Sequence, residues 1–455
     1  MIHLSKFFTS SSPLSHIGLN ALLIVLFCIL CGCNGDGSGG SDVGSDNDTN
    51  VEIDIFYEEI PGSKFDYHNQ TSWGYNQVKI VRFGDTVFMY VVDNDNVADG
   101  YPNATNPSKL YIYKKEGDNQ WEKGAGLNIS VPGNILIDSD GVLHAIVFEP
   151  ICTNDDGSRG KLIHYWFPDS NAGNIIDYEQ ETIIDADCGD WETVNIRVGA
   201  AIGLDDTLAI GFGLFTSDKG NTEQLYYKRK NDDAWTNLIA GQNLGHDFYY
   251  PYVLVNGDGG FHILAVQDDY TGPDQDNIFQ IIRYFEYKDG LWNNEIIVDL
   301  TSHELASTRP YLLEPSDFFQ DSSGTIHMFY KDNTDPDPEN EGSWALIYLI
   351  QEDDGSWQTY TLSQHSDRII WIRMIEYGGE FYYFYASAEG KLYLKKGVSG
   401  QLVELDIKWS SGGLYVSAPR GGTRSTEKYI DLLLLDENEA GTYYLRILKS
   451  ELRKL

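Results

Sequence analysis

The stretch that decides the fold is RPYLLEPSDFFQDSSGTIHMFYKD, residues 309–332. It reads as an apolar strand, a D-S-S-G turn and a second strand, because aromatic and β-branched residues favour strands while Asp, Ser and Gly favour turns. The same unit returns as PYVLVNGDGGFHILAVQDD (251–269) and as VPGNILIDSDGVLHAIVFEP (131–150). Looser copies begin at residues 78, 198, 372 and 415, which brings the number of units to seven.

A further strand follows each unit, and its polar turn often holds a tryptophan, as at Trp121, Trp235, Trp292 and Trp357. Trp235 and Trp292 are 57 residues apart, and Trp121 precedes Trp235 by twice that spacing. Seven such four-stranded units predict an all-β fold, a seven-bladed β-propeller. Closing the ring buries the faces that a single blade would expose, and the strand at 51–60 is expected to complete the last blade. A ring of six or eight blades and a pair of β-sandwiches are the alternatives.

The composition agrees with aromatic strands divided by turns, with 30 Tyr, 20 Phe, 10 Trp and 45 Gly. The formal net charge is −37, from 69 acidic and 32 basic residues. A surface of that sign repels phosphate backbones, which excludes a general nucleic-acid binder. An anionic polysaccharide would need a pocket with its own arginines. An acidic surface that serves solubility alone is the other interpretation.

The N-terminal segment reads as a secretory signal, because residues 19–30 are apolar, follow Lys6 and are too short to span a bilayer. Leu30, Gly32 and Cys33 resemble the lipobox of bacterial lipoproteins. The resemblance implies a signal peptide at 1–32, a lipidated Cys33 and, with Asn at position 34, a place in the outer membrane or at the cell surface. The Gly, Ser and Asp residues of 33–50 predict a flexible tether, leaving 51–455 for the propeller. An ordinary secretory signal is the alternative.

Two cysteines remain in the body of the chain, Cys152 and Cys188. In an oxidising compartment two such cysteines usually pair. Cys152 falls in a loop between second and third strands and Cys188 at the entry to the next blade, so both belong to one face of a propeller. We therefore predict a disulfide between them.

The D-x-D-G turns, the G-x-x-H strands and turns such as EDDGSW (352–357) resemble the repeats of secreted BNR-type and sialidase-like propellers. The likeness covers nearly the whole body. The Asp-box of that superfamily is present only in shortened form, and no F-R-I-P segment occurs. Sialidase chemistry is therefore not expected.

Blade entries and the loops between second and third strands share one face of a propeller, and here they are rich in aromatic and basic residues. Sugar sites combine aromatic faces with a few charged or amide donors. The predicted ligand-binding residues at this rim are His68, Trp73, Trp191, His246, Tyr249, His303, His365 and Arg368. The alternative is that aromatic residues near the axis only plug the channel and fasten the blades.

The histidines fall into two groups. His144, His262 and His327 share the repeat position G-x-x-H, which favours a structural role. His164 departs from the repeat, because we align it with Ile112, Tyr227 and Leu394 of other blades. If the hairpin turns near residue 154, His144 and His164 are cross-strand neighbours.

A histidine pair in a propeller is similar to the arrangement in ulvan-type polysaccharide lyases, which neutralise a uronate carboxylate and move its α-proton. The resemblance implies His164 and His144 as a catalytic pair, with Tyr250 as proton donor and Arg309 as carboxylate partner. Motifs for serine hydrolases, zinc proteases, phosphate loops and dinucleotides do not occur in the sequence.

No cofactor is expected, although the acidic loops at 93–108 and 332–343 could hold Ca²⁺; neither has the spacing of a twelve-residue calcium loop. The sequence thus predicts a lipid-anchored, monomeric propeller that engages carbohydrate as a polysaccharide lyase or glycosidase. A non-catalytic envelope scaffold or adhesion protein that binds another protein is the alternative.

Overall fold

The computed structural model describes the folded body of the chain, apart from several loops. The described residues are 51–60, 76–93, 103–152, 160–185, 193–194, 198–216, 220–240, 248–256, 259–267, 279–306, 312–335, 344–363, 369–387, 389–409, 413–418, 427–436 and 441–455. The predicted signal and tether therefore lie outside them. None of the described helices is long and apolar enough to cross a membrane.

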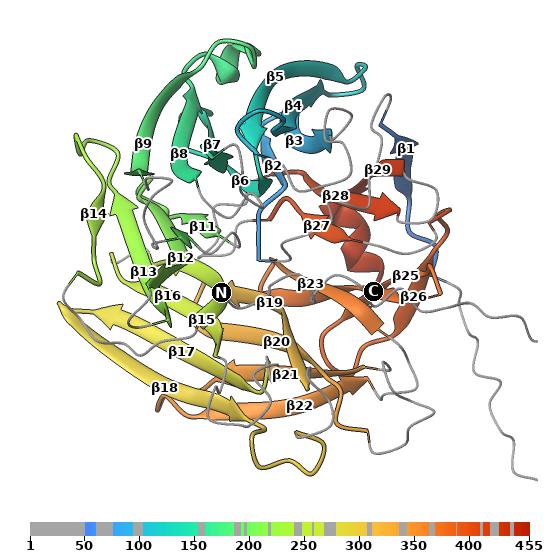
Figure 1. Cartoon of the computed structure of the whole chain (residues 1–455). Helices are drawn as coiled ribbons and strands as arrows, with labels where there is room; N and C mark the ends of the chain where they lie inside the picture. Colours follow the sequence, from blue (N-terminus) through green and yellow to red (C-terminus); the bar gives the residue numbers. More distant parts are fainter. Residues whose placement is uncertain are drawn as a thin grey trace, which may run out of the picture. The chain divides into compact units, whose positions relative to one another are not determined.

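Seven antiparallel sheets follow one another around a ring, each with its first strand innermost (Figure 1). Blade 1 holds β2 (Ile80–Phe83), β3 (Thr86–Asp93), β4 (Ser108–Glu116) and β5 (Glu122–Ile129). Blade 2 holds β6 (Val131–Ile137), β7 (Leu143–Pro150), β8 (Gly160–Phe167) and β9 (Glu179–Asp185). Blade 3 holds β10 (Thr193–Val194), β11 (Gly199–Ile202), β12 (Leu208–Thr216), β13 (Gly220–Lys228) and β14 (Thr236–Asn237). In blade 3 both β10 and β11 pair with β12, so its first strand is interrupted.

The second half of the ring repeats the pattern. Blade 4 holds β15 (Phe248–Val255), β16 (Phe261–Gln267), β17 (Ile281–Lys288) and β18 (Leu291–Asp299). Blade 5 holds β19 (Leu313–Gln320), β20 (Ile326–Asp332), β21 (Ala345–Gln351) and β22 (Trp357–Ser363). Blade 6 holds β23 (Ile369–Tyr377), β24 (Glu380–Ser387), β25 (Leu392–Lys396) and β26 (Leu402–Leu405). The described helices are two short 3₁₀ segments, η2 (Ser170–Ala172) and η5 (Lys449–Lys454).

Blade 7 is closed by the N-terminal end of the body. It holds β27 (Leu414–Val416), β28 (Tyr429–Asp436) and β29 (Gly441–Leu448), and its outermost strand is β1 (Ile55–Glu59). β1 pairs antiparallel with β29, with Ile55 opposite Ile447. The predicted seven-bladed propeller, and the closing role of the strand at 51–60, are confirmed.

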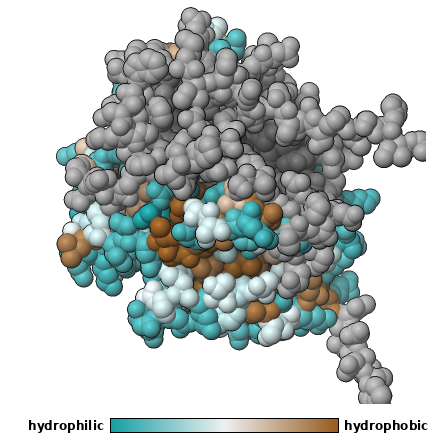
Figure 2. All heavy atoms as spheres, turned by 60° about the horizontal axis from the view of Figure 1, so that its bottom comes forward, coloured by the Kyte–Doolittle hydropathy of each residue, from teal (hydrophilic) through white to brown (hydrophobic). Residues whose placement is uncertain are grey.

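The apolar core is divided among the blade interfaces. Seven clusters of buried residues occur, and each draws on two neighbouring sheets. This is why the ring is stable where a single blade is not: each sheet buries both faces against its neighbours. The outermost strands are solvated, and Leu291 and Leu402 on β18 and β26 are exposed. In Figure 2 most of the coloured surface is hydrophilic, with hydrophobic residues in a band between hydrophilic ones.

One buried ion pair fastens the closure. Arg82 on β2 donates through Nε and Nη2 to the two carboxylate oxygens of Asp431 on β28, at 2.6 and 2.7 Å. The hydroxyl of Tyr444 donates to the same carboxylate at 2.6 Å. A bidentate, fully hydrogen-bonded pair of this kind satisfies both buried charges. It links the first blade to the last.

Candidate functional site

Side chains from four blades meet at the axis of the ring. Lys79 precedes β2 of blade 1, Tyr252 lies on β15 of blade 4, Arg373 on β23 of blade 6 and Tyr415 on β27 of blade 7. The Nζ atom of Lys79 lies 4.8 Å from the ring centre of Tyr415, and Cζ of Arg373 lies 5.4 Å from the same ring. Blade 4 borders neither blade 6 nor blade 7, yet the hydroxyl of Tyr252 interacts electrostatically with Arg373 and Tyr415, so these side chains approach one another across the axis. We call Lys79, Tyr90, Tyr252, Arg373 and Tyr415 the axial cluster.

The two cations of the axial cluster are held by aromatic rings and by neutral acceptors. Lys79 Nζ also lies 5.4 Å from the ring centre of Tyr90 and donates to Oε1 of Gln77 at 3.2 Å. Arg373 donates to the carbonyl oxygens of Ser316 and Ile372. Aromatic faces stabilise a buried cation without neutralising its charge.

Of the described residues, the carboxylates of Asp317 and Glu314 lie near the cluster, and both make bonds of their own. Asp317 accepts the backbone N–H groups of Phe318 and Met374 at 3.0 and 2.8 Å. Glu314 is paired with Lys331 at 2.5 Å. Burial raises the pKa of the Tyr252 hydroxyl most, and the negative charges of Asp317 and Glu314 raise it further.

Burial changes the proton affinities in the cluster. Lys79 is 0 % exposed. Burial, followed by the positive charge of Arg373, holds the pKa of Lys79 well below its usual value. Burial also raises the pKa of the Tyr252 hydroxyl well above its usual value. The lowered pKa of Lys79 favours its neutral amine, and the raised pKa of Tyr252 favours its protonated hydroxyl.

The predicted histidine pair is present between blades 2 and 3. Nδ1 of His144 lies 2.9 Å from Nε2 of His164, and Nδ1 of His164 lies 2.9 Å from Oε1 of Glu181. Burial lowers the pKa of His164 to about 4. Burial opposes the ionisation of Glu181, but hydrogen bonds from His164 and Lys228 lower the pKa of its carboxyl to about 2. Glu181 therefore accepts the Nδ1 proton of neutral His164, whose Nε2 accepts from Nδ1–H of His144.

The register of the pair differs from the prediction. His144 stands opposite Trp166, and His164 stands opposite Ile146, so the hairpin is centred near residue 155 and not near 154. The two histidines are diagonal neighbours. Diagonal neighbours remain within reach when both side chains are long or aromatic, so the contact forms in spite of the shift.

The place of His164 is taken by tyrosine in two other blades. His262 Nδ1 lies 2.6 Å from the hydroxyl of Tyr284, and His327 Nδ1 lies 2.8 Å from that of Tyr348. In both cases the tyrosine is offset by two residues from the position opposite the histidine, as His164 is from that opposite His144. Our alignment of His164 was one residue off in blade 1, where Val87 stands opposite Lys115, so that the counterpart of His164 is Tyr113 and not Ile112. In blades 4 and 5 the structural counterparts are Tyr284 and Tyr348.

The same ring position fastens neighbouring blades at three interfaces. The rings of His164, Tyr284 and Tyr444 lie edge-on to Trp235, Trp357 and Trp121 of the following blade, at 5.5, 5.3 and 5.2 Å between centroids. Each indole N–H in turn donates to a glutamate on the outermost strand of the preceding blade: Trp235 to Glu181, Trp357 to Glu295 and Trp121 to Glu58. We call this arrangement the tryptophan clamp. It explains three of the four repeated tryptophans, Trp121, Trp235 and Trp357.

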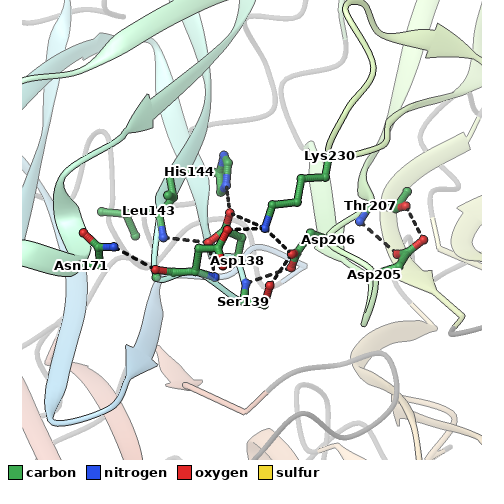
Figure 3. A network of polar contacts seen from close by, with 12 residues as sticks. Asp138, Ser139, Leu143, His144, Asn171, Asp205, Asp206, Thr207 and Lys230 are labelled. Carbon is green, nitrogen blue, oxygen red and sulfur yellow. Dashed lines mark hydrogen bonds and ion pairs between the residues drawn. The ribbon is translucent and has the colours of Figure 1, made fainter.

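A second polar network joins the turns of blades 2 and 3 beside His144 (Figure 3). Lys230 Nζ lies 2.6 Å from Asp140 and 2.8 Å from Asp206, and it also faces Asp138 at 3.8 Å. Nε2 of His144 lies 3.8 Å from the same oxygen of Asp138. The network contains more carboxylates than ammonium groups, so it disfavours an anionic ligand.

The structure brings together only part of the predicted catalytic set. His144 and His164 touch, whereas Tyr250 packs against Phe279 in the core between blades 4 and 5. Tyr249 borders that core, and the backbone of His303 takes part in a turn with Leu300 and Ala306. The catalytic role of the histidines is not tested by this placement and stays a prediction. The following predicted residues lie outside the described residues: Cys33, His68, Trp73, Cys188, Trp191, His246, Arg309, His365 and Arg368.

The remaining predictions about covalent links and metals are also untested. Cys152 is buried, but because Cys188 is not described the disulfide stays a prediction. Within the described ranges, no three His, Cys, Asp or Glu side chains are placed to hold a metal ion. Most of the acidic loops at 93–108 and 332–343 fall outside those ranges, so calcium there is untested.

Sequence reasoning missed the axial cluster. Lys79 and Arg373 occupy no motif, and each sits inside an otherwise apolar innermost strand or directly before one. A charged residue at such a position is unusual, because lysine and arginine are rarely buried without a partner. These charged residues at apolar strand positions were the sequence signal that could have revealed the axial cluster.

Comparison with known proteins identifies the fold. No family model and no curated protein matches the chain. Among solved structures, polysaccharide lyase Uly1 is similar with a TM-score of 0.57 and 11% identity, covering 86% of this chain and 94% of that one. A PL25 ulvan lyase bound to -[GlcA(1-4)Rha3S]- gives a TM-score of 0.51 and 11% identity, covering 82% and 93%. At these identities the likeness shows the propeller fold alone.

Proposed function

We propose that this protein is a lipid-anchored, extracytoplasmic propeller that binds an acidic polysaccharide at its axis and takes part in its breakdown. The observation that carries the proposal is that Lys79 and Arg373, which are far apart in the sequence, both lie beside the ring of Tyr415. The net charge of −37 repels an anionic polymer from the general surface. Local positive charge is therefore required for such a ligand, and the guanidinium of Arg373 belongs to the axial cluster.

The tyrosines of the axial cluster suit a sugar ligand as well. Aromatic faces and hydroxyl groups are the combination by which proteins hold sugar rings and their polar substituents. In the folded chain the hydroxyls of Tyr90 and Tyr252 donate to the carbonyl oxygens of Gly133 and Pro315 at 2.7 and 3.4 Å, so a sugar would have to replace these bonds. The buried position strengthens every charge interaction, because the effective dielectric there is lower than in water. A carboxylate or sulfate ester on a sugar would be attracted to such a site.

The fold neighbours support the same class of ligand. Two of them are described as polysaccharide lyases, and one is bound to an oligosaccharide that contains glucuronate and sulfated rhamnose. A lyase is the reaction class that needs a cation beside a uronate carboxylate. We therefore favour a lyase over a glycosidase.

Calorimetric titration of the full chain in detergent tests the binding step. We expect oligomers of galacturonate or glucuronate to bind, and neutral oligosaccharides of equal length not to bind. Arg373→Met should weaken binding at least about tenfold, because a charge-assisted bond to the acid group is lost. Arg283→Met is the matched control, since Arg283 lies on the third strand of blade 4 and bonds to Gln267 and Asn294.

The scaffold alternative predicts a different result. A chain that binds no acidic or neutral oligosaccharide, and instead co-purifies with one envelope protein in stoichiometric amount after crosslinking, would be an adhesion or scaffold protein. That outcome would overturn the carbohydrate proposal.

The anchor is a separate part of the proposal and rests on the sequence around Cys33. Metabolic labelling with a fatty-acid analogue should mark the native chain and leave Cys33→Ser unlabelled. An unlabelled native chain that is recovered in the soluble fraction would instead indicate an ordinary secretory signal.

A further inference from the structure

Three polar side chains meet where blade 1 borders blade 2, away from the axis. Lys109 on β4 and Asn128 on β5 stand opposite each other in register, and Nζ of Lys109 donates a hydrogen bond to Oδ1 of Asn128. Nδ2 of the same amide donates to Oε1 of Glu149 on β7, at 3.1 Å. The amide of Asn128 therefore has an amine at its oxygen and a carboxylate at its nitrogen.

The backbone holds these three side chains in place. Leu110, Leu127 and Phe148, each next to one of them in the sequence, are at most 1 % exposed and belong to the apolar core. The backbone N–H of Ser130 donates to the carbonyl oxygen of Phe148 at 2.9 Å, which ties the end of β5 to β7. Well-oriented groups that are fixed together react as if one of them were present at about 10⁵–10⁸ M. Such a gain lets an amine attack an amide that free amines leave intact.

We propose that Lys109 and Asn128 form an isopeptide bond, with Glu149 as the group that protonates the leaving nitrogen. The bond is a covalent modification of the chain itself, so it goes beyond the proposed function and does not depend on the carbohydrate ligand. It joins β4 to β5, the outermost strand of blade 1. An outermost strand is the part of a sheet that separates most easily, and the link holds it in place.

The reaction releases ammonia, and its atoms balance without a co-reactant. One proton of the Lys109 ammonium passes through solvent to the carboxylate of Glu149, because the site is half-buried and water can reach it. The amine attacks Cγ of Asn128, so that the Nζ–Cγ bond forms. Glu149 gives its proton to Nδ2, and the Cγ–Nδ2 bond breaks. The departing ammonia takes up a second proton from Nζ and leaves as ammonium.

Mass spectrometry of a tryptic digest of the full chain tests the link. We expect the segment that contains Lys109 to stay joined to the segment that contains Asn128, with a mass one ammonia below the sum of the two. Trypsin should not cut after Lys109, because its ammonium group is gone. Lys109→Arg should abolish the joined peptide, since a guanidinium does not attack an amide. Glu149→Gln, in freshly prepared protein, should lower the joined fraction at least about tenfold, because it keeps a polar group but transfers no proton.

Lys161→Arg is the matched control. Lys161 stands opposite Glu149 on β8 and pairs with Asp185, so this variant changes a neighbour of the site and should leave the joined fraction as in the native chain. Two separate peptides of full mass in the native digest would show that Lys109 and Asn128 share only a hydrogen bond, and the inference would be overturned. That digest decides the matter even if a variant does not fold. An equal joined fraction in Glu149→Gln would overturn the role of Glu149. Neither result bears on carbohydrate binding.

Discussion

His164 contacts His144 from the same position in its blade as that from which Tyr284 contacts His262. In both blades the second-strand histidine contacts a third-strand ring offset by two residues, and that ring lies edge-on to a tryptophan of the next blade. This equivalence allows a structural role of His164 in the tryptophan clamp to be distinguished from a catalytic role. If the ring serves the tryptophan clamp, tyrosine can replace it.

His164→Tyr tests this directly. From the clamp geometry we expect a folded protein whose free energy of unfolding changes by no more than about 1 kcal/mol, and carbohydrate cleavage that is unchanged. The sequence-based prediction of catalysis by His164 instead expects a loss of rate of about a hundredfold or more. Tyr284→His is the control, since it makes the reciprocal change in blade 4. Chemical denaturation and product formation distinguish the outcomes.

The tryptophan clamp should contribute measurably to stability. Trp235→Phe removes the indole N–H that donates to Glu181 at 3.0 Å while keeping an aromatic ring. We expect a loss of about 1 kcal/mol, the usual net value of one hydrogen bond. Trp292→Phe is a matched control, because the buried Nε1 of Trp292 has no hydrogen-bond partner among the described residues. Equal losses in the two variants would show that the N–H bond contributes nothing.

Ring closure depends on the pair formed by Arg82 and Asp431. Arg82→Met leaves the buried carboxylate of Asp431 without its guanidinium, and removing one partner of such a pair costs about 3–5 kcal/mol. The double variant Arg82→Met with Asp431→Leu should recover part of that loss, since no buried charge remains. Urea denaturation of the three chains measures both values. A double variant less stable than Arg82→Met would contradict the account.

Glu223 should make the protein less stable as the pH rises. Its side chain is 2 % exposed, and neither carboxylate oxygen accepts a hydrogen bond from a side chain in the described part of the chain. Burial raises its pKa well above the ordinary 4.5, so the folded state binds the proton more tightly than the unfolded state. Stability from this group is fully present below pH 4.5 and is lost as the pH rises toward the folded pKa.

Glu223→Gln should remove that slope, because glutamine resembles the protonated acid and does not titrate. Glu181 provides the opposite control. Its pKa is lowered to about 2, so its contribution is present above pH 4.5 and is lost as the pH falls through about 2. Melting temperatures from pH 2 to 9 measure both slopes. A Glu223→Gln variant that follows the native curve would contradict the burial argument.

The fold could be read from the sequence because its signal is local and repeated. Each blade carries its own turn between two apolar strands, as at Asp138 and Asp321, whose carboxylates accept backbone N–H groups two and four residues ahead. Repetition makes such a signal visible above the variation of single residues. The tryptophan spacing indicated the length of the repeat, and the tryptophan clamp explains why Trp121, Trp235 and Trp357 recur in it.

The axial cluster could not be read in the same way. Lys79 and Arg373 are 294 positions apart in the sequence and share no motif, so only the closure of the ring shows that they meet. The one-residue error in the hairpin centre of blade 2 had a similar cause, since turn length sets register and the loop carries no distinctive turn sequence. The histidine contact survived because the rings are long enough to reach diagonally.

The most direct test of the account is a crystal structure of the full chain with a tetramer of the uronate polymer that it binds. We expect a sugar carboxylate about 3 Å from the guanidinium of Arg373. A tetramer bound elsewhere, such as beside His144 between blades 2 and 3, would contradict it.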